Sequence, residues 1–181
     1  LGRPVEPNIG VFDDGWDPNR ALWGVYTSGP LQWFPGAGAD LYYLGLERGS
    51  AEFDQGEAHE LRHSFGVRLF GRPQPWDYNF EAVYEFGKFG DGRIEAWTAA
   101  SDTGFTIEAL PAKPRLGLKA NITSGDRDPD AEGLQTFNAF FPRGTYFSEA
   151  ALIGPANHID VHPSLSLRPA GGMTISAEWD F

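Results

Sequence analysis

The chain has 181 residues, a formal net charge of −11 and no cysteine. This length suffices for one domain with a sizeable core, and the lack of cysteine excludes disulfides and thiolate chemistry. An acidic chain lacks the basic footprint that nucleic-acid binding needs, so we expect no nucleic-acid partner. With 14 % aromatic residues, 23 glycines and 14 prolines, the composition favours strands and tight turns over helices.

Neither a transmembrane helix nor a signal peptide is predicted. The longest charge-free run, 21–39, is interrupted by several glycines and prolines. The chain opens on Leu1, without a basic region followed by an apolar one. We therefore expect either that a signal was removed or that this is an internal piece of a longer protein.

Strand-like runs follow one another after 18 residues that look irregular. They lie at 19–28, 39–48, 59–71, 76–87, 92–108, 114–124, 159–168 and 172–181. Most reach about ten residues, the length that crosses a bilayer, whereas strands of soluble domains are typically about five or six. The pattern predicts one all-β domain over 1–181, an antiparallel up-and-down meander that is part of a larger transmembrane β-barrel and incomplete by itself.

The clearest strand is 77–86, which carries two different faces. Side chains alternate in direction along a strand, so its odd and even positions separate. One face carries Tyr78, Phe80, Ala82, Tyr84 and Phe86, and the other carries Asp77, Asn79, Glu81, Val83 and Glu85. A wall between lipid and a wet lumen has this composition. We expect Tyr78, Phe80, Tyr84, Leu116, Leu118 and Ile122 to face lipid.

Two features fit the alternation less well. His63 falls on the apolar side of its strand, and the alternation of 92–108 shifts near Ser101–Gly104, which predicts a β-bulge. The connections are expected to alternate in length, with a very long one that includes 131–157 and an intermediate one at 49–58.

Basic and acidic side chains share the polar side of these strands. The predicted ligand-binding residues are Arg62, Arg68, Arg115 and Lys119, together with Glu81, Glu85, Asp77 and Asn79. Guanidinium groups bind carboxylates as a fork, so this set suits an anionic polysaccharide or a small anion. The alternative is that these charges only pair with one another across neighbouring strands.

Other constellations give weaker indications. Asp126, Asp128 and Asp130 alternate as in calcium loops, but Pro129 interrupts them, and the pair His158 and His162 is a weak metal motif. Glu81 and Glu85 would lie roughly 13 Å apart along one strand, too far for a glycosidase pair. We expect no enzyme activity, no bound metal and no cofactor.

The segment Thr136–Gly144 reads TFNAFFPRG and is too apolar for a freely solvated loop. We expect it either to fold inward and plug a cavity or to pack on a neighbouring loop.

Several longer motifs resemble one family of Gram-negative outer-membrane barrels, the alginate export family. They are SGDRDPD at 124–130, TFNAFFPRGTYF at 136–147 and GPANHIDVHPSL at 154–165. DLYYLGLER, FDQGEAHELRHSFG, PWDYNFEAVYEFG, AWTAASDTGF and PRLGLKA look like the same family and extend the resemblance over nearly the whole chain.

The resemblance implies a monomeric barrel in the outer membrane that passes an anionic polysaccharide such as alginate outward through an arginine-rich lumen. It also implies a chain more than twice as long with about eighteen strands, of which this would be a segment. Two alternatives stay open: a soluble β-sandwich that binds or cleaves carbohydrate, and an eight-stranded barrel complete in itself.

Overall fold

The structure, a computed structural model, describes residues 5–6, 15–34, 36–128, 132–140, 157–170 and 172–181. Its strands are β1 Val5–Glu6, β2 Gly15–Trp16, β3 Arg20–Pro30, β4 Ala37–Phe53, β5 Gly56–Gly71, β6 Trp76–Phe89, β7 Gly92–Thr106, β8 Arg115–Thr123, β9 His158–Leu167 and β10 Ile175–Glu178. No helix long and apolar enough to cross a membrane occurs among these residues.

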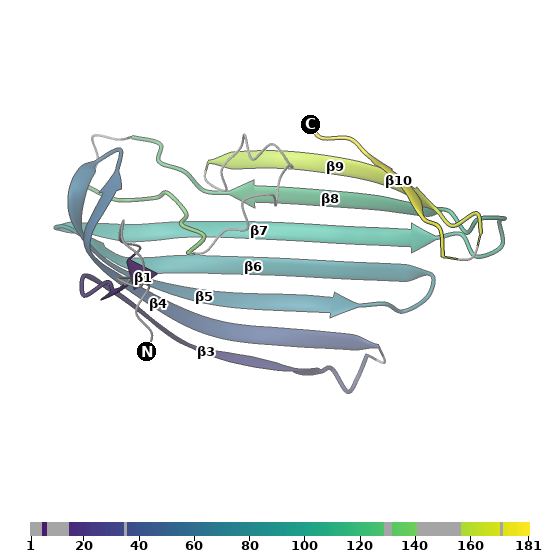
Figure 1. Cartoon of the computed structure of the whole chain (residues 1–181), viewed down its shortest axis with the longest axis horizontal. Coiled ribbons are helices and arrows are strands. Elements are labelled where there is room, and N and C mark those ends of the chain that lie inside the picture. Colours follow the sequence, from purple (N-terminus) through teal and green to yellow (C-terminus); the bar gives the residue numbers. More distant parts are fainter. Residues whose placement is uncertain (1–4, 7–14, 35, 129–131, 141–156, 171) are drawn as a thin grey trace.

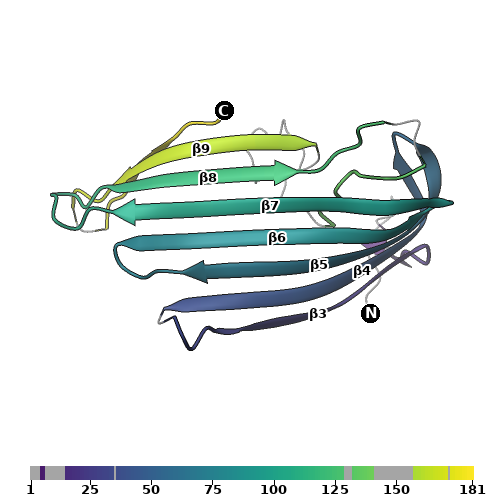
Figure 2. The same cartoon turned by 180° about the vertical axis from the view of Figure 1, so that it is seen from behind.

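Strands β3 to β10 form one antiparallel sheet in which every strand pairs with its neighbours in sequence. Figure 1 shows this sheet as a single curved layer, and Figure 2 shows it from behind. The predicted all-β meander of eight strands is confirmed. Beside this sheet the described residues form only the two-stranded sheet of β1 and β2, so they do not contain the two large facing layers of a soluble β-sandwich. The described sheet is not closed into an eight-stranded barrel, because β3 and β10 are its two edges.

The hairpin of β4 and β5 differs most from the sequence prediction. The intermediate connection expected at 49–58 is strand on both sides of a turn at Asp54 and Gln55. The register of the two strands shifts between Arg48 and Ala51, which is the only register shift among the described strand pairs. A bulge disturbs the alternation locally, and this explains why the strands appeared to end near Arg48. Residues 5–6 and 15–16, expected to be irregular, pair as β1 and β2.

The bulge expected at Ser101–Gly104 is also wrong. Strand β7 keeps an unbroken register with β6 from Gly92 to Phe105. The apparent shift arises because Ile94 and Ala96 are apolar residues on the same side as Asp102. Both are buried, at 1 % and 0 % exposure, and Leu134 forms an isolated parallel β-bridge with Ile94.

The segment after β8 folds back over the sheet, as one of the two expectations for residues 136–144 had it; 141–144 lie outside the described residues. Leu134 donates to the Arg93 carbonyl at 2.9 Å, and its own carbonyl accepts from Glu95 at 3.0 Å. Leu134 packs with Ile94, Phe89 and Ala51 in a small buried cluster. We call residues 134–138 the inner segment.

One face of the sheet, the apolar face, arranges its aromatic residues in two zones. Tyr43, Phe65, Tyr84 and Trp97 are register partners across β4 to β7, and Trp76 pairs with Phe105 toward the other end. Between these zones lies a row of aliphatic residues, Val67, Ala82, Ala99 and Ile122. Two aromatic girdles that flank an aliphatic band are typical of barrels in a bilayer.

His63 also lies on the apolar face, where the sequence pattern is mismatched. Its Nδ1 atom lies 2.7 Å from the Tyr43 hydroxyl, and the two rings stack with centroids 5.9 Å apart. Because a neighbouring hydroxyl satisfies this nitrogen, the imidazole can occupy an otherwise aromatic surface.

Candidate functional site

The opposite face, the polar face, carries all the residues that the sequence analysis selected as ligand-binding. The register pairs Glu81 with Arg68 and Glu85 with Ser64 across β5 and β6, so these side chains stand on one side of the sheet. Lys119 pairs with Asp102 across β7 and β8, which extends the same face. The alternation read from the sequence thus places every selected residue on one surface.

Arg62 is the centre of a buried ion cluster. It is fully buried, and its guanidinium donates to Glu60 at 2.7 Å and to Glu85 at 2.6 Å. Ser64 donates to the other oxygen of Glu85 at 3.0 Å, and Arg48 contacts Glu60. In a low-dielectric site such charges are tolerated only when each is paired.

The inner segment covers this cluster. Arg62 donates to the Thr136 carbonyl at 3.0 Å, and the Asn138 amide donates to Glu85 at 2.9 Å. Arg62 and Glu85 therefore lie beneath the inner segment and form hydrogen bonds with its backbone.

Arg68 lies further along β5 and belongs to a second group that is partly open to solvent. It donates to Asn79 at 2.6 Å and to Asp40 at 3.2 Å. The Tyr26 hydroxyl also donates to Asp40, at 2.7 Å. The Arg68 side chain is 36 % exposed, so its guanidinium can be reached from the polar face.

Arg115 forms a third group at the far end of the sheet. Its guanidinium binds both oxygens of Asp77, at 2.8 and 2.5 Å, and approaches Asp102 at 3.4 Å. Two glycines give it room, because a Cβ atom on Gly104 would come within 2.2 Å of the guanidinium and one on Gly117 within 2.6 Å. Arg115 thus lies flat on the sheet with part of its surface exposed.

Lys119 and Glu81 line a hollow of about 240 Å³ that spans β6 to β10. The Lys119 ammonium donates to Glu178 at 2.8 Å, and Glu81 accepts from the Tyr42 hydroxyl at 2.6 Å. Asn79 lines the same hollow. Asn79 and Glu81, from one motif, and Lys119, from another, are therefore brought together by the fold.

All four selected cations have carboxylate partners on this face, as the alternative interpretation of the sequence required. Sequence reasoning did not select several of the partners, namely Asp40, Glu60, Asp102 and Glu178. Glu60 and Glu178 were visible as polar positions of alternating strands. Their pairing depends on which strands become neighbours, and one sequence alone does not state this.

The acidic loop after β8 has a structural role within the described residues. Asp126 accepts hydrogen bonds from the Gln55 side chain and from the Gln135 amide, so it ties the inner segment to the β4–β5 hairpin. Asp130 lies outside the described residues. Among those that are described, the group that satisfies the geometry of a metal site is His162, Glu178 and Asp180.

A single meander with an aromatic, aliphatic face and an ion-paired polar face has the wall architecture of an outer-membrane β-barrel transport protein. The chain belongs to the alginate export family, whose model, described as "Alginate export", matches residues 3–180. This confirms the resemblance seen in the motifs. No curated protein and no solved structure is similar to the chain at a significant level.

The alginate export family is a family of outer-membrane transport proteins and not of enzymes, so membership supports a role in alginate export.

Proposed function

We propose that the chain forms part of the wall of a passive outer-membrane channel, through which an anionic polysaccharide such as alginate leaves the cell. The polar face would line the lumen, and the apolar face would contact lipid through Tyr78, Phe80, Tyr84, Leu116, Leu118 and Ile122. The observation that carries the proposal is that an aromatic and aliphatic face and an ion-paired face lie on opposite sides of the sheet over seven consecutive strand pairs. Neither turnover nor a cofactor is part of this function, and one barrel acts as a monomer.

The pairing of the lumen cations suggests how a polyanion passes without becoming trapped. Arg68, Arg115 and Lys119 remain 36 %, 21 % and 43 % exposed although each has a carboxylate partner. Exposed ion pairs contribute roughly 0–1 kcal/mol. A uronate carboxylate can therefore replace the aspartate or glutamate at little cost, and the protein carboxylate takes the cation back when the sugar moves on.

Reversing two accessible lumen charges tests this route. We expect Arg115→Glu combined with Lys119→Glu to shift the reversal potential in planar bilayers toward cation selectivity, because both carboxylates would repel anions entering the lumen. We also expect block of the current by oligouronate to weaken severalfold, while neutral dextran of the same size has the same effect on both proteins.

A matched control separates lumen charge from total charge. Arg93 is an exposed residue on the apolar side of β7, so Arg93→Glu makes the same kind of charge change outside the lumen. Its selectivity should equal that of the wild type. Unchanged selectivity in the double variant, or an equal change in the Arg93 variant, would contradict the proposed lumen.

The inner segment narrows the proposed lumen, because it lies on the polar face above Arg62. Leu134 is completely buried there, so Leu134→Asp should release the segment by placing a charge in an apolar cluster. We expect a larger single-channel conductance and faster protease cleavage within 132–140. Leu110→Asp, at an exposed residue of the β7–β8 turn, should leave both unchanged. A conductance equal to that of the wild type would show that the segment does not restrict the passage.

A further inference from the structure

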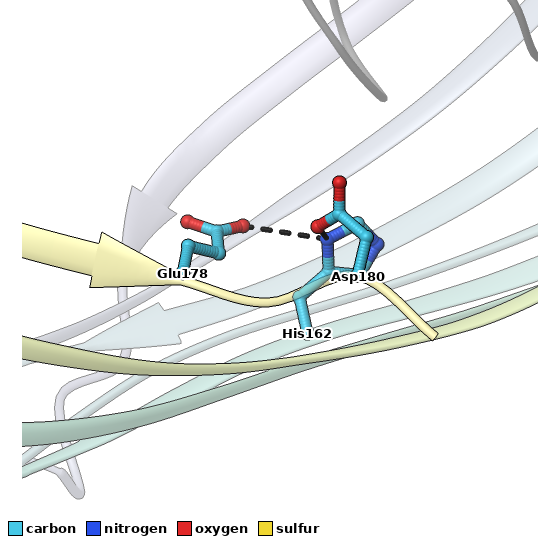
Figure 3. Close-up of side chains that lie close together, drawn as sticks. All are labelled: His162, Glu178 and Asp180. Atoms are coloured by element: carbon cyan, nitrogen blue, oxygen red, sulfur yellow. Dashed lines mark ion pairs between the residues drawn. The ribbon is translucent and has the colours of Figure 1, made fainter.

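Three metal-ligating side chains converge where β9 meets the segment that starts with β10. The His162 Nδ1 atom lies 2.5 Å from Asp180 Oδ1 and 3.4 Å from Glu178 Oε1. Figure 3 shows both carboxylates approaching the same edge of the imidazole ring. One ligand atom from each side chain lies within 4.8 Å of the other two, the spacing that a single cation can bridge.

The second nitrogen of His162 has a different and buried partner. Its Nε2 atom contacts Asp160 Oδ2, which also accepts a hydrogen bond from Asn121 at 2.8 Å. Asp160 is only 5 % exposed, and its Oδ1 atom lies 3.0 Å from the Nε2 atom of His158. When Nε2–H donates a hydrogen bond to this carboxylate, the lone pair of Nδ1 is available for a metal, and metal-binding histidines are oriented in this way.

The charges around His162 favour a cation. Asp160, Glu178 and Asp180 contribute three negative charges, and Lys119 offsets one of them through Glu178. Two negative charges therefore remain around one imidazole, which a divalent cation balances. Because Asp160 is buried, leaving its negative charge without a compensating positive charge would cost free energy in this low-dielectric site.

We propose that His162 Nδ1, Glu178 and Asp180 bind a divalent cation of the zinc type on the polar face of the sheet, with Asp160 as the residue that positions the imidazole. One nitrogen and two carboxylate oxygens form a ligand set that Zn²⁺ accepts, with a fourth position open. Ca²⁺ and Mg²⁺ take oxygen ligands, usually six or more for Ca²⁺, so an imidazole nitrogen is a poor ligand for both. His162 and Glu178 also line the hollow that contains Asn79 and Glu81, from which water can reach a bound cation. The site is independent of what passes through the lumen.

The test measures binding of zinc chloride to the full-length protein in detergent by isothermal titration calorimetry. We expect one zinc ion per chain, and at least a tenfold loss of affinity in Asp180→Asn. The Asp180 side chain is 59 % exposed, so we expect this replacement to leave the fold intact. Asp160→Asn should weaken binding about 10–100-fold, the effect usual for a carboxylate that orients a histidine ligand.

Two further variants make the test specific. Lys119→Ala should increase the zinc affinity, because the ammonium group that competes for Glu178 at 2.8 Å is removed. The control is His59→Ala, which removes an exposed histidine that lies 3.1 Å from Glu47 on another part of the sheet, and it should bind zinc as the wild type does.

Absence of zinc binding in the wild type would overturn the proposal. Wild-type affinity in both Asp180→Asn and His162→Ala would do the same, as would calcium chloride that displaces zinc at equal concentration. A Lys119→Ala variant with lower affinity would show that Lys119 supports the site instead of competing with the cation, which contradicts the proposed coordination.

Discussion

Replacing Arg62 by methionine should lower the free energy of unfolding by about 3–5 kcal/mol, the usual cost of removing one partner from a buried ion cluster. Methionine keeps much of the side-chain volume but leaves Glu60 and Glu85, at 0 % and 1 % exposure, without their common guanidinium. The carbonyl of Thr136 also loses its donor. We therefore expect the largest single loss of stability among the polar-face cations at this position.

Urea unfolding of the protein reconstituted in lipid vesicles, followed by tryptophan fluorescence, measures the change. The matched control is Arg68→Met on the same strand and the same face, which removes an arginine whose side chain is 36 % exposed. Asp40, which is 2 % exposed, keeps the hydrogen bond from the Tyr26 hydroxyl, and Asn79 is partly open to solvent, so a smaller loss is expected. Equal losses in the two variants would show that Arg62 is not a special structural residue.

Replacing Ala82 by arginine should cost about 2–4 kcal/mol, the cost of a cation at the lipid-facing midplane of a barrel. Ala82 is exposed on the apolar face and lies on β6 halfway between Trp76 and Tyr78 at one end and Tyr84 and Phe86 at the other. If these aromatic residues mark the two interfaces of the bilayer, a charge at Ala82 has the longest distance to reach water.

The same unfolding experiment, together with heat-modifiable gel migration as a check of assembly, tests this prediction. Ala82→Leu controls for side-chain size and should change stability little, because a leucine in the aliphatic band remains apolar. Glu95→Arg places the same guanidinium on the same face of β7, beyond the aromatic zone that contains Trp97, and should be tolerated. Normal stability of Ala82→Arg would mean that lipid does not contact this face.

The two experiments separate the two faces of one strand pair. Arg62 and Ala82 lie on neighbouring strands, yet a charge is required at the first position and should be excluded from the second. This difference follows from the period of two in a strand, because a shift of one residue moves a side chain to the other face. Loss of stability in both experiments is the result that a channel wall predicts, whereas a sheet with water on both sides would tolerate Ala82→Arg.

The alternation of residues 77–86 determined the faces correctly, because the chemistry of each side chain on β6 reports its own surroundings. In other strands the pattern was misleading at two places: it predicted an early strand end near Arg48 and a bulge at Ser101–Gly104. Near Arg48 the bulge removed the period, and near Ile94 a distant segment covered the polar face and allowed apolar residues there. In both places the cause lies in a second stretch of chain, and the local pattern contains no trace of it.

The sequence by itself determined that the protein is an all-β meander with one apolar and one polar face, and its motifs indicated the alginate export family that the comparison then showed. Only the tertiary structure decided how the selected charges differ from one another. Arg62 is sealed beneath the inner segment, Arg115 rests in a glycine cradle, and His162 meets Glu178 and Asp180. Side-chain direction is a local property of a strand, whereas burial and pairing depend on residues far away in the chain. Arg62 and Thr136, 74 positions apart, are an example that no local pattern could provide.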